Sequence, residues 1–75
     1  MDPINLATAE AVRDAIHTAR TTQAAVKRGA RIPHSNWQRR MSGRSSFKIA
    51  ELQRIARLLG VSLGELCDDA AGRVS

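Results

Sequence analysis

The chain has 75 residues, of which 43% are hydrophobic, and a formal net charge of +5. A chain of this length buries only about 60% of the surface that its unfolded form exposes, so it holds one modest core and cannot be a two-domain enzyme. The hydrophobic content is too high for a disordered tail, yet no apolar run approaches the roughly 18 residues of a transmembrane helix.

Helix-forming residues dominate, and strand signals are almost absent. The sequence contains no tyrosine, no alternating Val/Thr run and no Asn-Gly or Asp-Gly pair, whereas Ala, Leu, Arg and Gln are frequent. We therefore predict an all-α fold, a compact bundle of about five short helices. A single domain is expected over residues 1–69 and a frayed C-terminal tail over residues 70–75.

The first predicted helix has three candidate starts, at Asp2-Pro3, Asn5 and Thr8. Apolar residues at helical spacing predict one buried stripe, formed by Ala9, Val12, Ile16 and Ala19. His17 is expected on or beside this buried side, without a catalytic partner. The charged residues of this helix are expected to face water, namely Glu10, Arg13 and Asp14.

A short second helix is predicted over residues 23–28, with Thr22 as its N-cap. Gly29 allows the chain to turn near the end of this helix, whose core residues are expected to be Val26 and Ala30.

Proline keeps the residue before it extended, so Ile32 is assigned to a turn that ends at Pro33. A third helix is predicted from Pro33 or His34 to Met41, followed by Ser42-Gly43. Residues 44–47 are then predicted to form a polar connector whose last residue, Phe47, packs back on the core.

The strongest periodicity belongs to a fourth helix that ends at Gly60, a typical C-cap. Its buried face is expected to comprise Ile49, Leu52, Ile55, Ala56 and Leu59. The residues expected outside that face are Glu51, Arg54 and Arg57. Ser62 and Glu65 form a predicted capping box, which begins a short fifth helix through Leu66 and Cys67.

Positive charge is concentrated in one stretch of the chain. Residues 15–50 contain eight Lys or Arg residues and no Asp or Glu, whereas the rest of the chain contains four basic and seven acidic residues. The net charge is therefore +8 in this stretch and −3 in the rest of the chain. A surface of this kind attracts polyanions, of which nucleic acid and anionic membranes are the common cases. The alternative is a solvated basic surface that serves solubility.

Two short helices joined by a tight turn in this basic stretch form the layout of a helix-turn-helix. Residues 22–43 resemble the helix-turn-helix of the lambda-repressor/Cro (XRE-type) family of phage and bacterial regulators. The resemblance rests on matching spacing of Thr22-Gln23, Ile32, Trp37 and Gly43. Residues 58–66 are similar to the usual close of the family's fourth helix, and the likeness covers about residues 12–66.

The chain departs from the family pattern at three positions. Lys27 stands where a small alanine usually packs between the two helices, and Arg31 stands where the turn usually has glycine. Arg40 occupies a position that is often apolar, so Met41 is expected to do the packing that Arg40 cannot.

With Trp37 inward, the polar residues on the outward side of the third helix are expected to contact DNA bases. They are His34, Ser35, Gln38 and Arg39, which are also the positions that the resemblance implies. Arginine can bind guanine with two hydrogen bonds, and glutamine can bind adenine in the same way. Predicted phosphate contacts surround this helix and comprise Thr22, Gln23, Ser42, Arg44 and Lys48. For Lys27, Arg28 and Arg31, a phosphate contact and a solvated charge are equally supported.

The resemblance implies a sequence-specific regulator of transcription that binds double-stranded DNA, a phage or prophage repressor of the Cro type that blocks a promoter. Family members usually bind as dimers, and the apolar surface available to pair two copies comprises Leu63, Leu66 and Cys67. The alternative is that these leucines cap the core of the monomer, which is small enough to need them. The alternative is a protein-interaction module, such as an antitoxin or a regulatory subunit. RNA binding and membrane binding are disfavoured, because the chain lacks stacking aromatics and a continuous basic amphipathic helix.

No enzyme, cofactor, metal or small-molecule ligand is expected. The chain contains no combination of nucleophile, base and orienting residue. Cys67 has no second cysteine to pair with, and it does not cluster with His17 and His34 at the spacing of a zinc site. Neighbouring acids also leave its thiol unactivated, so an interface or partly buried role is expected. With no export segment at the N-terminus, we expect a cytoplasmic location.

Overall fold

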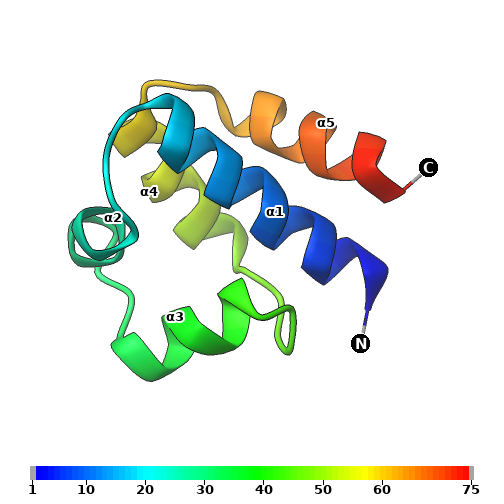
Figure 1. Cartoon of the computed structure of the whole chain (residues 1–75), viewed down its shortest axis with the longest axis horizontal. Coiled ribbons are helices and arrows are strands. Elements are labelled where there is room, and N and C mark those ends of the chain that lie inside the picture. Colours follow the sequence, from blue (N-terminus) through cyan, green and yellow to red (C-terminus); the bar gives the residue numbers. More distant parts are fainter. Residues whose placement is uncertain (1, 75) are drawn as a thin grey trace.

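Residues 2–74, the part of the chain that this computed structural model describes, contain five α-helices. No strand occurs within that range, so the all-α prediction is confirmed. The helices are α1 (Pro3–Thr18), α2 (Gln23–Gly29), α3 (His34–Met41), α4 (Ile49–Leu59) and α5 (Leu63–Val74). Figure 1 shows α1 and α5 lying side by side in opposite directions, with α3 at the other side of the bundle.

Side-chain caps set the starts of the first two helices. The Asp2 Oδ1 atom accepts a hydrogen bond from the backbone N–H of Ile4 at 2.9 Å, and Pro3 follows directly, which selects the earliest of the three candidate starts. The Thr22 Oγ1 atom accepts one from the backbone N–H of Ala25 at 3.1 Å, so the predicted N-cap of α2 is confirmed.

Helix α5 is longer than predicted. Its start is as expected, because the Ser62 hydroxyl oxygen accepts a hydrogen bond from the Glu65 backbone N–H at 3.0 Å. The helix then continues to Val74, so the expectation of a frayed tail is wrong for residues 70–74, while Ser75 lies outside the described residues. The reason is packing on α1, because one buried cluster joins Ala7, Ala11 and Ala70.

The turn between α2 and α3 is closed by backbone hydrogen bonds. The N–H of Arg31 donates to the carbonyl of Arg28, and the N–H of Ile32 donates to the carbonyl of Lys27, both at 3.1 Å. Arg31 has φ of 59°, the left-handed conformation in which glycine is usual, at a cost of about 1 kcal/mol. The turn residue is therefore Arg31, whereas Gly29 is still helical.

The main core lies between α1, α4 and the α2–α3 pair. An edge-to-face contact joins Trp37 and Phe47, with ring centroids 6.1 Å apart and an interplanar angle of 80°, so both aromatics are inward as expected. The buried residues of this core are Val12, Ile16, Val26, Ala30, Ile32, Trp37, Met41, Phe47, Leu52, Ile55, Ala56 and Leu66.

Three residues expected in or beside the core are instead exposed. Ala19 is the C-cap of α1 and lies past the covered part of the helix, and His17 faces away from the buried Val12 and Ile16. Ile49, the first residue of α4, keeps 65% of its surface exposed. Periodicity along a helix identifies its apolar side but does not say how far neighbouring helices extend over it.

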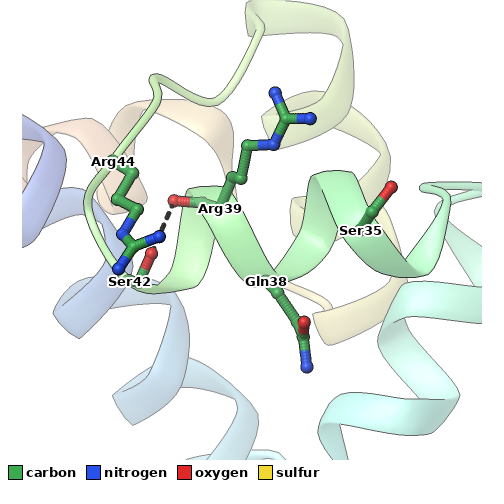
Figure 2. A pocket seen from close by; sticks show the side chains of 5 residues that line it. All are labelled: Ser35, Gln38, Arg39, Ser42 and Arg44. Carbon is green, nitrogen blue, oxygen red and sulfur yellow. Dashed lines mark hydrogen bonds between the residues drawn. The ribbon is translucent and has the colours of Figure 1, made fainter.

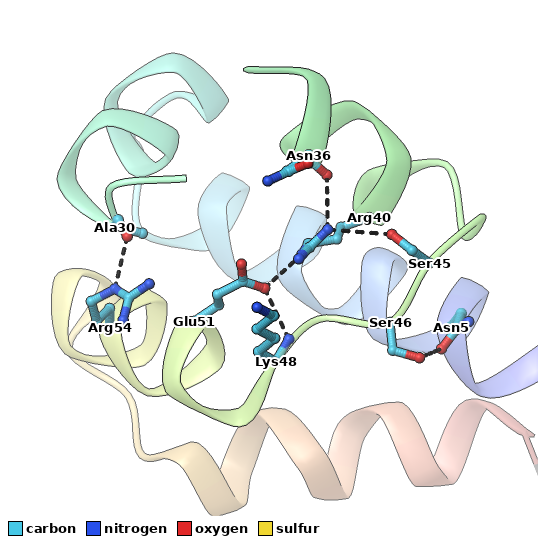
Figure 3. A network of polar contacts seen from close by, with 9 residues as sticks. All are labelled: Asn5, Ala30, Asn36, Arg40, Ser45, Ser46, Lys48, Glu51 and Arg54. Atoms are coloured by element: carbon cyan, nitrogen blue, oxygen red, sulfur yellow. Dashed lines mark hydrogen bonds and ion pairs between the residues drawn. The ribbon is translucent and has the colours of Figure 1, made fainter. Parts of the chain in front are cut away.

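Arginine side chains from α1 and α4 hold the ends of the two short helices. Arg54 donates from Nε to the carbonyl of Ala30 at 2.8 Å, just past α2 (Figure 3). Arg13 donates from Nη2 to the carbonyl of Met41 at 3.3 Å, at the end of α3. The last carbonyls of a helix have no partner within it, so these contacts satisfy the backbone and orient α2 and α3.

Candidate nucleic-acid interface

Helix α3 buries one side and exposes the other. Trp37, Arg40 and Met41 are buried at i, i+3 and i+4, which places them on one face. The predicted base-contacting residues are all exposed, and they are His34, Ser35, Gln38 and Arg39. The phase of α3 therefore follows from the inward position of Trp37, as expected.

A polar pocket, here called the α3 pocket, runs along the exposed side of this helix. It is lined by Ser35, Gln38, Arg39, Ser42 and Arg44. Figure 2 shows the Arg39 and Gln38 side chains leaving α3 in different directions, with Arg44 reaching in from the loop beyond the helix. Three predicted base contacts and two predicted phosphate contacts thus share one surface. None of these five lining residues is acidic.

The end of α3 constrains what Ser42 can do. Its hydroxyl donates to the Arg39 carbonyl at 3.0 Å, and the Arg44 backbone N–H donates to the same carbonyl at 2.9 Å. Gly43 follows with φ of 80°, which turns the chain away from the helix. A hydroxyl has one hydrogen, so in this arrangement Ser42 has only acceptor capacity left, whereas Arg44 keeps its whole guanidinium.

His34 lies apart from Arg39, in a second pocket between α2 and α3. This α2–α3 pocket is lined by Gln23, Ala24, Lys27, His34, Trp37 and Gln38. Gln38 borders both pockets, so the exposed surface of α3 is continuous from one to the other. The Lys27 Nζ and His34 Nδ1 atoms are 3.0 Å apart across the α2–α3 pocket.

Gln23 is held in place by the buried tryptophan. The Trp37 indole Nε1–H donates to the Gln23 Oε1 atom at 3.3 Å. An indole nitrogen is only a donor, so the oxygen of Gln23 must face it and the amide hydrogens remain for another acceptor. Thr22 has a related arrangement, because its hydroxyl oxygen accepts from Ala25 and its hydroxyl hydrogen remains to donate. Both predicted phosphate contacts therefore present donors.

Lys48, the last predicted phosphate contact, is the N-cap residue of α4 and is exposed. Its backbone N–H donates to the Glu51 Oε1 atom at 2.9 Å, which fixes the start of α4 next to the connector.

A buried ion pair joins α3 to α4, and sequence reasoning missed it. The Arg40 Nε atom donates to Glu51 Oε1 at 2.6 Å, with about a tenth or less of either side chain exposed. Arg40 Nη1 also reaches the Ser45 hydroxyl at 3.3 Å and the Asn36 carbonyl at 3.5 Å (Figure 3). The prediction that Glu51 faces water is wrong, and Arg40 is buried together with Met41. The available signal was Arg40 itself, three residues after Trp37 and so on the inward face.

The surroundings of Glu51 favour its charged form. Burial alone raises the pKa of this carboxyl, but the hydrogen bonds from Arg40 and the Lys48 backbone, with the charges of both residues, outweigh burial and lower the pKa below its ordinary value. The positive charge of Arg40 is therefore neutralised by Glu51 inside the fold. The basic stretch of residues 15–50 therefore presents seven outward charges rather than eight.

The predicted dimer surface is smaller than expected. Leu66 is only 5% exposed and belongs to the monomer core, and Leu63 is partly buried against it. Cys67, expected in an interface or partly buried, is exposed. It borders an apolar pocket between α1, α4 and α5, whose other lining residues are Ile4, Thr8, Val12, Leu52, Leu66 and Ala70.

No protein-family model, curated protein or solved structure matches this chain. The likeness to the lambda-repressor/Cro family therefore stays a prediction that rests on residues 22–43 and 58–66. Across residues 2–74, no helix has the length and apolar character needed to cross a membrane. The same range contains no group of three or more His, Cys, Asp or Glu side chains arranged to hold a metal ion.

Proposed function

We propose that this protein is a sequence-specific regulator of transcription that binds double-stranded DNA, with α2 and α3 as its helix-turn-helix. The observation that carries the proposal is the α3 pocket, in which Ser35, Gln38 and Arg39 stand beside Ser42 and Arg44 on the exposed side of one helix. A helix fits the major groove, and these side chains have the donors and acceptors that read base edges there.

Within this proposal, Arg39 and Gln38 are the main base readers. Arg39 binds guanine through O6 and N7, and Gln38 binds adenine through N6 and N7. Ser35 donates or accepts on a neighbouring base, and His34 contacts the DNA from the α2–α3 pocket. These four side chains are exposed, so their polar groups remain available to bases.

Phosphate contacts flank α3 on both sides. Thr22 and Gln23 present donors at the start of α2, while Arg44 and Lys48 lie beyond the other end of α3. Such contacts set the register of a protein on the duplex without reading its sequence. Ser42 contributes only if its hydroxyl leaves the Arg39 carbonyl.

The regulatory mechanism that we propose is occlusion, in which the protein covers an operator that overlaps a promoter, as a Cro-type phage or prophage repressor does in a bacterial cytoplasm. We further propose that two copies occupy two half-sites about one helical turn apart. Leu63 and Cys67 remain available for pairing, since Leu66 is used by the core. Sedimentation of the protein with and without its duplex measures this stoichiometry.

The deciding experiment is selection from a pool of random duplexes, repeated over a range of salt concentrations. We expect one enriched sequence and an affinity that falls steeply with salt, because bound phosphates release counterions. Failure to enrich any sequence, or an affinity insensitive to salt, would overturn the proposal.

Two variants separate reading from backbone contact. Arg39→Ala should make the binding free energy for the selected duplex less favourable by about 1–3 kcal/mol and should reduce the discrimination between bases at one base pair. Arg44→Ala should weaken binding to all sequences alike and lower the salt slope by about one. Equal effects of both variants on every sequence would contradict these assigned roles.

A second candidate function is a protein-interaction module, such as an antitoxin or regulatory subunit. The apolar pocket between α1, α4 and α5 supports it, because Ile4, which lines that pocket, is an exposed large apolar residue. If this candidate is right, no duplex should be enriched in the selection, and Arg39→Ala should bind the partner protein as well as the wild type does.

A further inference from the structure

The Lys27–His34 contact connects the two short helices across a pocket of otherwise uncharged residues. The Nζ atom of Lys27 lies 3.0 Å from Nδ1 of His34, and the remaining described lining is Gln23, Ala24, Trp37 and Gln38. Lys27 is half-buried on α2, while His34 is the exposed first residue of α3. The pocket therefore sets one ammonium against one imidazole.

The chemistry of the two groups decides the direction of this hydrogen bond. A lysine ammonium has three N–H donors and no acceptor, so Nδ1 of His34 must be the acceptor. A neutral imidazole carries one hydrogen, so the hydrogen of His34 is then on Nε2. We infer that Lys27 is a positioning residue that holds His34 in the Nε2–H tautomer, so that His34 presents a hydrogen-bond donor to the DNA.

This inference rests on the proposed function for its ligand and narrows what that ligand can be. A fixed Nε2–H group binds an acceptor atom, such as purine N7, guanine O6, thymine O4 or a phosphate oxygen. It does not favour the amino groups of adenine and cytosine, which are donors. Lys27 keeps two N–H donors for a phosphate, in line with the free amide hydrogens of Gln23 in the same pocket.

Ring-nitrogen NMR of the free protein tests the tautomer without DNA. At pH 8.5, above the usual titration range of histidine, the nitrogen shifts distinguish Nδ1–H from Nε2–H. We expect His34 to be almost entirely Nε2–H and Lys27→Met to lower the ratio of the two tautomers about fivefold. The exposed His17 is the internal reference, and Arg28→Met, which removes a neighbouring charge from α2, is the matched control. A His34 ring with Nδ1–H, or a ratio equal in wild type and Lys27→Met, would overturn the inference. If Lys27→Met does not fold, the comparison within the wild type decides: a tautomer ratio at His34 no higher than that at the exposed His17 would overturn the inference.

The DNA experiments identify the acceptor. If the acceptor is a base atom, Lys27→Met should reduce the preference at one base pair of the selected duplex about fivefold, whereas Arg28→Met should retain this preference. If the acceptor is a phosphate oxygen, both variants should keep the base preferences of the wild type. The difference in affinity between wild type and His34→Ala identifies the acceptor. If this difference disappears on a duplex with a 7-deazapurine, the acceptor is N7, and if it disappears on a duplex with a single methylphosphonate, the acceptor is a phosphate oxygen. A preference for adenine or cytosine amino groups at the position sensitive to His34→Ala contradicts the inference. If no duplex is enriched, the proposed function fails, while the NMR result still decides the tautomer.

Discussion

The α1–α5 pair and the α2–α3 pair are held in the protein by different means. Helices α1 and α5 meet through alanines, whose small side chains let the two helices approach closely, as at Ala7 and Ala70. Helix α3 is instead anchored by large groups, the Trp37 ring and the Arg40 guanidinium. A short helix makes few contacts, so each of its anchors has a greater effect on its position.

The two pairs also differ in charge. Arg73 on α5 is surrounded by carboxylates of both helices, namely Glu10, Asp14 and Asp69. On α3, by contrast, the buried side chains anchor the helix to the core, and the exposed Gln38 and Arg39 side chains border open pockets. Changes on the outer side of α3 should therefore alter binding, whereas changes at the anchors should alter stability.

The largest effect is expected at the buried ion pair. Glu51→Ala leaves the buried Arg40 charge without a counter-charge, so the free energy of unfolding should fall by about 3–5 kcal/mol, as measured by urea denaturation. The double variant Arg40→Met/Glu51→Leu removes both charges and should recover most of this loss. A loss below about 1 kcal/mol in Glu51→Ala would mean that the pair does not anchor α3.

The next effect is expected where α1 and α5 are closest. Ala70→Leu forces extra volume into the alanine cluster and should lower the free energy of unfolding by about 1–3 kcal/mol. Ala71→Leu, on the exposed side of the same helix, is the matched control and should leave stability nearly unchanged. The preferred DNA sequence should be the same in both variants; a changed preference would show that the two regions are not separable.

Acid should weaken the α3 anchor by a smaller amount than Glu51→Ala, because protonation leaves the side chain in place. The pKa of Glu51 is lower in the folded protein than in the unfolded chain, so its contribution is fully present above the unfolded value of about 4.3 and is lost as pH falls through the folded pKa. Urea midpoints measured from pH 6 to pH 3 should therefore decline less in Arg40→Met/Glu51→Leu than in wild type. If the urea midpoints of both proteins decline in parallel, Glu51 is not the cause of the acid sensitivity.

The smallest effect is expected at the α1–α5 ion pairs. Hydrogen bonds from Arg73 to Asp69 and Asp14 raise the pKa of its guanidinium, but the group is solvent-exposed and salt screens it. Arg73→Gln should shift the urea midpoint only slightly at low salt and not at all in 1 M salt. A loss comparable to that of Ala70→Leu would show that charge, rather than close packing, joins α1 to α5.

Local residue patterns were enough to predict the helical class and most helix starts. Caps at Thr22 and Ser62 join atoms only three residues apart, so residue type alone indicates them, whereas Asp2 was one of three candidate starts of α1. The outward side of α3 could also be predicted from local information, because the inward position of Trp37 sets the direction of every other side chain on that helix.

Which residues the bundle covers, and which charged side chains meet, depends instead on how the helices pack. Ile49 is exposed, Glu51 is buried and α5 extends to Val74, because burial depends on where other helices lie and periodicity does not carry that information. The Arg40–Glu51 pair and the Lys27–His34 contact likewise form between helices. Hydrogen bonds require atoms within about 3 Å, and only the packing of α2, α3 and α4 brings these atoms that close.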